Sequence, residues 1–150
     1  MTVDAATQYN DRSVGLGIVI RDGCGGVRAV KSINLQVHSS IIAEAMAVWQ
    51  GLILAVDHGF LPCRIESDSL QVVDMINKGT RLLSDVGPVI SLICGSLIAN
   101  SGCGISHISR KANSVAHCLA KVALSIDSFR CWLDCCPPCV ERLVLLDDSG

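Results

Sequence analysis

The sequence predicts an α/β domain built on a mixed β-sheet. Segments with strand character come first along the chain, and later strand-like segments alternate with segments in which apolar residues recur at helical spacing. Strands joined by short turns pair antiparallel, whereas a strand that follows a helix commonly joins a sheet in parallel. The length of 150 residues, half of them hydrophobic, suffices for one domain with a full core.

The predicted elements follow the order β-β-β-α-β-α-α-β-α. β-branched runs on either side of a glycine-rich turn indicate a hairpin, and turn or cap residues separate the later elements. The predicted strands are a first one around Val3 and Asp4, then 14–20, 27–37, 63–67 and 103–109. The predicted helices are 41–57 with Ser39 or Ser40 as N-cap, 69–77 with Asp68 or Ser69 as N-cap, 85–100 and 112–124, and an apolar run at 140–146 ends the chain.

The composition limits the environment and the partners of this protein. The formal net charge is −2, and no basic run carries interleaved aromatic residues, which argues against binding nucleic acid by bulk charge alone. The apolar stretch 41–56 is interrupted by Glu44 and Gln50, so we expect no membrane span. The N-terminus lacks the basic and apolar regions of a signal peptide, and we expect an intracellular location.

The nine cysteines are then expected to be free thiols, several of them at core positions. Four lie close together near the end of the chain, at Cys131, Cys135, Cys136 and Cys139, and the last two form a C-x-x-C motif. A structural zinc site normally needs a second ligand pair at a suitable separation. We therefore favour the interpretation that these cysteines pack apolar surface, with zinc binding as the alternative.

Three carboxylates lie at positions where they could form a functional site. Asp4 lies in the first strand, Glu44 on the edge of the apolar face of the first helix, and Asp68 between a strand and a helix. Each has a simpler interpretation, as a turn residue, a first-turn acid favoured by the helix dipole, and an N-cap, respectively. Open α/β sheets place ligands at the carboxyl ends of their strands. The three acids together are more specific than any one of them.

Ordered motifs cover nearly the whole chain. They read VDAA at 3–6, GLGIVIRD at 15–22, AEAMAVWQGL at 43–52, IESDSL at 65–70, HISRKAN at 107–113 and VAHCLA at 115–120. With these motifs, and with its final segment 132–148, the chain resembles the plant ribonuclease H-like modules of type 1 that are related to the reverse transcriptases of non-LTR retroelements. The resemblance implies a five-stranded mixed sheet with helices on both faces, in a domain at 1–128 that is followed by an apolar tail at 129–150.

Active members of this family hold two Mg²⁺ ions with four acidic residues and cleave the RNA strand of RNA–DNA hybrids. One ion activates water and the other stabilises the leaving 3′-oxygen. The resemblance therefore implies an endoribonuclease in which Asp4 bridges the ions while Glu44 and Asp68 complete the ligand set. Mg²⁺ is the expected cofactor, with Mn²⁺ as the alternative. The expected partner is an RNA–DNA hybrid, and the expected oligomeric state is a monomer.

The sequence departs from the family pattern at two places. His117 stands at the position of the fourth acid, and imidazole is a poor ligand for Mg²⁺ and a better one for softer ions. It would complete the metal site, hold a metal-bound water or move a proton, or it is simply an exposed helix histidine. Only three residues precede Asp4, so we expect its strand to be short or the chain to be truncated, and Asp4 to be the ligand held least rigidly.

Three further residues belong to the site implied by the resemblance. His107 matches a family histidine near the scissile phosphate and is expected to assist catalysis; the alternative is a structural hydrogen bond at a strand end. Asn113 matches a position near the substrate, although capping of the following helix is the simpler interpretation. Arg110 lies beside the site and is expected to contact a phosphate.

The sequence leaves three functional hypotheses. The first is the hybrid-cleaving enzyme, which the retained carboxylates favour. The second is a catalytically weakened nucleic-acid-binding module left by a retroelement, which His117 and the low positive charge favour. The third is a module whose apolar tail at 140–146 docks on another protein, and an exposed patch there would support it.

Overall fold

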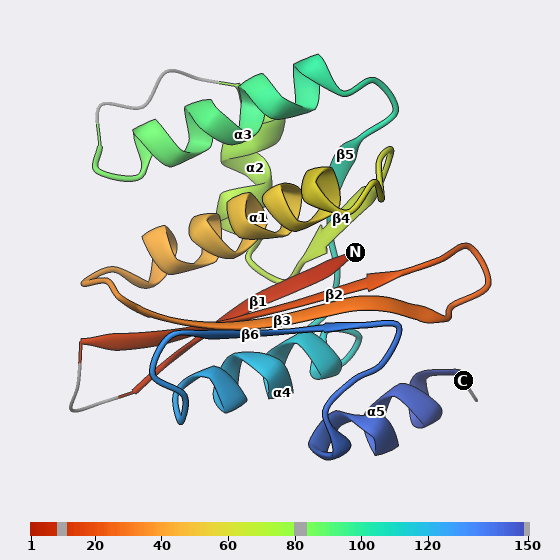
Figure 1. The fold of residues 1–150 in the computed structure, drawn as a ribbon. Coiled ribbons are helices and arrows are strands. Elements are labelled where there is room, and N and C mark those ends of the chain that lie inside the picture. Colours follow the sequence, from red (N-terminus) through yellow and green to blue (C-terminus); the bar gives the residue numbers. More distant parts are fainter. Residues whose placement is uncertain (9–11, 80–83, 149–150) are drawn as a thin grey trace.

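The computed structural model describes residues 1–8, 12–79 and 84–148, and within them the chain forms one mixed sheet with helices on both faces (Figure 1). The strands are β1 (Thr2–Thr7), β2 (Ser13–Arg21), β3 (Val27–Gln36), β4 (Arg64–Ser67), β5 (Gly104–His107) and β6 (Phe129–Leu133). The helices are α1 (Ser40–Asp57), α2 (Leu70–Lys78), α3 (Gly87–Ala99), α4 (Ser114–Ala123) and α5 (Pro138–Asp148).

The strand order in the sheet is β5-β4-β1-β2-β3-β6. β1, β2 and β3 pair antiparallel in sequence, as the turn-linked early segments predict, whereas β4 joins β1 and β5 joins β4 in parallel. The mixed α/β fold is thus confirmed. The described part of the sheet has six strands instead of the predicted five, because β6 pairs antiparallel with the edge of β3.

β6 escaped prediction because an edge strand buries little of its surface. Phe129 and Leu133 at its two ends are exposed, so the strand lacks the alternation of buried and exposed residues that identifies a half-buried strand. After it, α5 returns the chain against α4, where Val140 is fully buried. The predicted apolar patch of the tail is therefore split, since Val140 packs in the core while Leu145 and Leu146 remain exposed.

The helices form a layer on each face of the sheet (Figure 1). On one face α1 packs against β1 and β2, with α2 and α3 beside it, and on the other face α4 lies across β1, β2 and β3 next to α5. Ser39 is the N-cap of α1 and accepts a hydrogen bond from the amide of Ile42, and His58 ends the helix, both as predicted. The layer order places β1 between α1 and α4, and the C-terminal end of β4 lies beside the start of β1.

α1 is the one described helix that could cross a membrane by its length and composition, despite the polar interruptions at Glu44 and Gln50. In the fold it is a core helix. Its buried residues face the sheet and the neighbouring helices, and they are Ala43, Ala45, Ala47, Val48, Gly51, Leu52, Leu54 and Ala55. A core helix of a globular domain meets the same criteria of length and composition.

Two glycines let α4 lie directly on the backbone of β2. A Cβ atom at Gly15 would overlap the carbonyl oxygen of Ala120, and a Cβ atom at Gly17 would overlap that of Ala116. The side chain of Ser32 on β3 adds a buried hydrogen bond of 2.9 Å to the carbonyl oxygen of Leu119. The close approach sets the distance between α4 and the acidic residue of β1.

The cysteines are all free thiols, as expected, but none of the nine is fully buried. Cys63, Cys94, Cys118 and Cys136 are half-buried at the margins of the core. Three of the four tail cysteines, Cys131, Cys135 and Cys139, are exposed, which corrects the expectation that they pack apolar surface. Among the residues that the structure describes, they do not form a group with metal-ligand spacing.

Candidate metal centre

Three carboxylates from three different elements converge on the sheet. Asp4 lies on β1, Glu44 on the second turn of α1, and Asp68 directly after β4. Because β1 and β4 are parallel neighbours, with Val3 opposite Ser67, the acids that follow these two residues emerge side by side. One oxygen from each carboxylate lies within 4.8 Å of the other two. The convergence that the acidic motifs predict is therefore present.

Asp4 is held firmly, contrary to the expectation that it would be the least rigid member. β1 is central and pairs with β2 along its whole length and with β4 at its start. Asp4 itself is only 3% exposed. Its position near the start of the sequence is compensated by neighbours on both edges of the strand, which fix its backbone.

The electrostatics of the cluster favour an added cation. Burial, and then the negative charge of Asp68, raise the pKa of Asp4 to about 6, against the lowering effect of the hydrogen bond from His117. Burial, and then the charges of Asp4 and Asp68, raise the pKa of Glu44 to about 8. The Oε2 atom of Glu44 is buried without a hydrogen-bond partner. Carboxylates that repel one another, together with a buried oxygen that lacks a donor, fit a hard divalent cation.

His117 contacts the cluster from the opposite layer. It lies on α4, its side chain is half exposed, and its Nδ1 atom is 2.7 Å from Oδ2 of Asp4. Asp4 pairs with Gly17 in the sheet, and Ala116 lies against the backbone of Gly17. The residue after Ala116 is thereby brought beside Asp4. His117 is thus exposed on its helix, as the simpler interpretation expects, but it also contacts Asp4, which that interpretation leaves out.

Asn113 connects the cluster to the backbone of β1. It occupies the N-cap position of α4, but its side chain makes no capping hydrogen bond, so the capping interpretation fails. Its Nδ2 atom instead donates to the carbonyl oxygen of Val3 at 2.9 Å and to Oδ1 of Asp68 at 3.2 Å. Asp68 likewise is not an N-cap, because Ser69 occupies that position in α2. Both residues therefore serve the cluster and not the helix ends.

Arg110 and His107 lie at the margin of the cluster. The Nε atom of Arg110 is 3.5 Å from Oδ2 of Asp68, and the Arg110 side chain is 94% exposed, so this ion pair is weak. His107 ends β5 opposite Ser67 and is exposed. Within the described residues its ring makes no hydrogen bond, and it is not among the residues whose ligand atoms converge.

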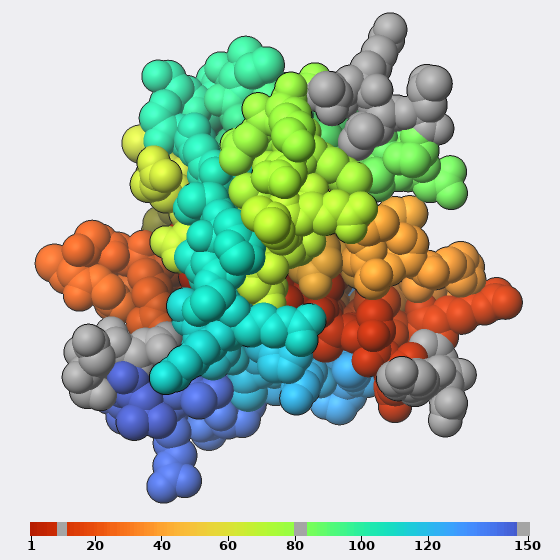
Figure 2. Space-filling model, turned by 180° about the vertical axis from the view of Figure 1, so that it is seen from behind, coloured from red at the N-terminus to blue at the C-terminus, as the bar shows by residue number. Residues whose placement is uncertain are grey.

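A groove of about 310 Å³ begins at the cluster and runs along α4. It is lined by Asp68, Arg110, Ser114, His117, Cys118, Lys121 and Leu143. Four of these stand at helical spacing on one stripe of α4, so the spacing from His117 could have identified Lys121 in the sequence. Leu143 on α5 forms the opposite wall, and only the tertiary structure brings it there. Figure 2 shows the red N-terminal segment reaching the surface between α2 (yellow-green) and α4 (light blue).

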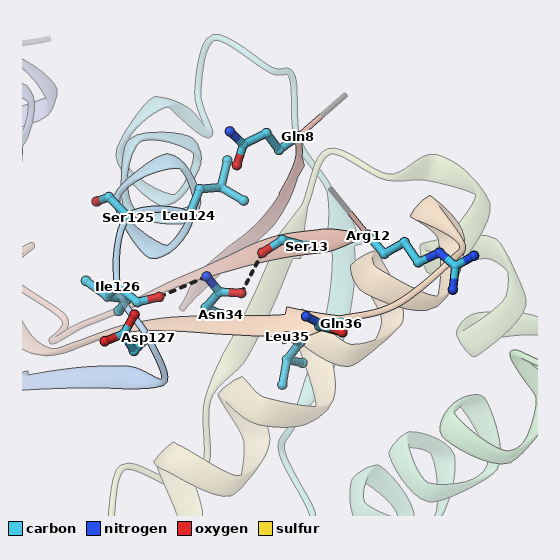
Figure 3. A pocket seen from close by; sticks show the side chains of 10 residues that line it. All are labelled: Gln8, Arg12, Ser13, Asn34, Leu35, Gln36, Leu124, Ser125, Ile126 and Asp127. Carbon is cyan, nitrogen blue, oxygen red and sulfur yellow. Dashed lines mark hydrogen bonds between the residues drawn. The ribbon is translucent and has the colours of Figure 1, made fainter. Parts of the chain in front are cut away.

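A larger cavity, of about 700 Å³, lies beyond the other end of β1. Its lining residues come from the strand ends and the segment after α4, and they are Gln8, Arg12, Ser13, Asn34, Leu35, Gln36, Leu124, Ser125, Ile126 and Asp127 (Figure 3). Asn34 accepts a hydrogen bond from Ser13 at 2.7 Å and donates one to the carbonyl oxygen of Ile126 at 2.8 Å. The polar groups at the centre of this cavity thus form hydrogen bonds with one another. The cavity does not include the acidic cluster.

Comparisons with solved structures show the same architecture in ribonucleases H. The ribonuclease H1 of Halobacterium salinarum NRC-1 superposes with a TM-score of 0.76 at 25% sequence identity, covering 82% of this chain and 94% of that one. LC11 ribonuclease H1 in complex with an RNA/DNA hybrid gives 0.71 at 19% identity, with 82% and 94% covered. The foamy viral protease-reverse transcriptase in complex with an RNA/DNA hybrid gives 0.69 at 19% identity, with 83% and 19% covered.

No curated protein matches this sequence. The model of the reverse transcriptase-like family, however, matches residues 2–123, which include the three carboxylates and His117. The chain therefore belongs to the reverse transcriptase-like family and has the ribonuclease H fold.

Proposed function

We propose that this chain is a metal-dependent endoribonuclease that cleaves the RNA strand of RNA–DNA hybrids. The observation that carries the proposal is the convergence of Asp4, Glu44 and Asp68, with a buried oxygen of Glu44 that lacks a partner. The similarity to ribonuclease H1 structures supports the reaction class. Two of the similar structures are complexes with RNA/DNA hybrids, which supports the substrate class.

The three carboxylates are the proposed metal ligands, and Mg²⁺ is the proposed cofactor, with Mn²⁺ as a substitute. Carboxylate oxygens are the ligands that both ions accept in proteins. When bound, divalent ions supply an activated water and charge stabilisation for the leaving oxygen. The protein holds its ligands on rigid elements, since Asp4 lies on a central strand and Glu44 on the core helix α1.

The surrounding residues have positioning and binding roles in this proposal. Asn113 fixes Asp68 relative to β1 and is buried, so we assign it to positioning. Arg110 and Lys121 line the groove beside the cluster and are proposed to contact substrate phosphates. His107 is exposed at the end of β5 and is proposed to transfer a proton during product release. With so few cations near the cluster, binding of the hybrid should be weak and should weaken further as salt increases.

The motifs also support a proposed origin and organisation. We propose that the module is of ribonuclease H type 1, derives from a plant non-LTR retroelement, and acts as an intracellular monomer. Residues 1–128 would form the domain, and 129–150 would form a tail that contributes β6 and α5 to it.

The test is cleavage of a hybrid whose RNA strand is labelled, with Mg²⁺ or Mn²⁺. We expect cleavage by the natural sequence and a loss of roughly a hundredfold or more in Asp68→Asn, because removing a metal-binding carboxylate costs several kcal/mol of transition-state stabilisation. Asp74→Asn, on the exposed face of α2, is the matched control and should cleave normally. If the folded protein cleaves no faster than Asp68→Asn with either metal, the enzyme hypothesis fails.

Replacing His117 by aspartate is expected to raise Mg²⁺-supported cleavage, by about tenfold if the new carboxylate contributes one ligand interaction of ordinary strength. The reason is that His117 already touches Asp4, so a carboxylate placed there would face the same ions. Cleavage rates at saturating Mg²⁺ measure the effect. An unchanged rate would remove His117 from the site.

A catalytically weakened nucleic-acid-binding module is the second candidate. The observation that favours it is the contact of His117 with Asp4, which occupies an oxygen of a proposed metal ligand. Fluorescence anisotropy with a labelled hybrid, run beside the cleavage assay, separates the two functions. Hybrid binding without cleavage would favour this candidate over the enzyme.

A further inference from the structure

We propose that, without nucleic acid bound, this chain holds a single divalent cation between Asp4, Glu44 and Asp68, and that His117 excludes a second cation from the α4 side of Asp4. The inference rests on the proposed metal-dependent function and departs from the two ions that the family resemblance implies. It follows from which carboxylate oxygens already have partners and which do not.

The side-chain donors of the protein all approach the cluster from the side of α4. His117 contacts Oδ2 of Asp4 at 2.7 Å, Asn113 donates to Oδ1 of Asp68 at 3.2 Å, and Arg110 lies 3.5 Å from Oδ2 of Asp68. These three residues belong to α4 or to the segment that leads into it. On that side the oxygens of both aspartates are engaged before any ion arrives.

The side of the cluster that faces α1 is different. Oε2 of Glu44 is buried and has no hydrogen-bond partner among the described residues. One oxygen of each of the three carboxylates lies within 4.8 Å of the others. Mg²⁺ binds oxygen at about 2.0–2.1 Å, so two ligands on opposite sides of one ion are about 4.2 Å apart. The cluster therefore fits one ion after a small contraction.

A second ion would need ligands on the other side of Asp4. Paired catalytic ions stand about 3.5–4 Å apart and share a bridging carboxylate, so the second would lie toward α4. There it would meet the imidazole of His117 in place of a carboxylate, and a ring nitrogen is a poor ligand for Mg²⁺. Asn113 and Arg110 direct N–H donors at the oxygens of Asp68, and donors repel a cation.

His117 cannot easily give way, because α4 is fixed against the sheet. Gly17 leaves no room between β2 and the backbone of Ala116, and Ser32 bonds the carbonyl oxygen of Leu119 in the interior of the molecule. The helix thus holds the backbone of His117 close to Asp4. The number of bound ions is therefore determined by the side chain at position 117.

The experiment counts bound ions directly, using Mn²⁺ as the probe and electron paramagnetic resonance to measure free Mn²⁺ at equilibrium. We expect one ion per chain for the natural sequence and for His117→Asn, which keeps an N–H donor beside Asp4. We expect two ions for His117→Asp. Circular dichroism establishes that each variant is folded, and Asp68→Asn should reduce the affinity of the first ion.

The outcomes separate the inference from the function on which it rests. Two ions bound to the natural sequence would overturn the inference and leave the proposed metal-dependent function intact. A single ion in His117→Asp as well would also overturn it, because position 117 would then not set the number. No ion bound to the folded natural sequence would overturn both proposals.

Discussion

Gly17→Ala is expected to lower the free energy of unfolding by about 3 kcal/mol, at the upper end of the cost of overpacking a core. The added Cβ atom would overlap the carbonyl oxygen of Ala116 and lie 2.5 Å from the backbone nitrogen of Ala120. Both are backbone atoms of α4, so the whole helix must move away from β2. Urea unfolding followed by circular dichroism measures the effect.

Gly95→Ala is the matched control for this substitution. Gly95 lies on the exposed side of α3, and a Cβ atom there would meet nothing within 4 Å. Alanine has the higher helix propensity, so this variant should be more stable by about 0.5–1 kcal/mol. If Gly17→Ala were as stable as the natural sequence, the close packing of α4 on β2, and with it the fixed position of His117, would be refuted.

Glu44→Gln is expected to raise the free energy of unfolding of the metal-free protein at pH 9 by about 2 kcal/mol. This is less than the full pKa shift of Glu44 corresponds to, because a buried charged site relaxes and admits water. Burial and the neighbouring charges raise the pKa of Glu44 from its ordinary 4.5 to about 8. Between these values the folded state keeps a proton that the unfolded state releases. The contribution of Glu44 to stability is therefore full below pH 4.5 and is lost as the pH rises through 8.

Denaturant unfolding between pH 5 and pH 9 in the presence of a chelator tests this dependence. Glu141→Gln, exposed on α5, is the matched control and should leave the pH profile unchanged. Mg²⁺ at a hundred times its dissociation constant should stabilise the natural sequence by about 2.7 kcal/mol. The same Mg²⁺ concentration should stabilise Glu44→Gln less. A profile for Glu44→Gln that falls with pH as steeply as that of the natural sequence would contradict the assignment of Glu44 to the buried cluster.

The acidic cluster was predictable because each of its members carries a local signal. Asp4 sits in an apolar strand, Glu44 on the edge of an apolar helix face, and Asp68 at the junction of a strand and a helix. Parallel pairing of β1 with β4 then places two of them side by side. A polar residue at a buried position can be recognised from the sequence alone, because hydrophobic periodicity indicates which positions are buried.

The partners of those acids were not predictable in the same way. Asn113 occupies an N-cap position, and capping was the simpler interpretation, yet its amide reaches Val3 and Asp68 across the sheet. His117 was compatible with several roles until α4 was placed against β2. Both contacts join residues more than forty positions apart, and local propensity carries no information about such pairs.

The sequence by itself thus predicted the α/β class and the mixed sheet, since periodicity and turn residues act locally, and its resemblance to a known family singled out the three carboxylates. Only the tertiary structure decided that β6 extends the sheet, that Asp4 is firmly held, and that His117 contacts it. The physical reason is that these features depend on packing between distant segments. The closest of these approaches, between α4 and β2, exists because two glycines leave the space that any side chain would fill.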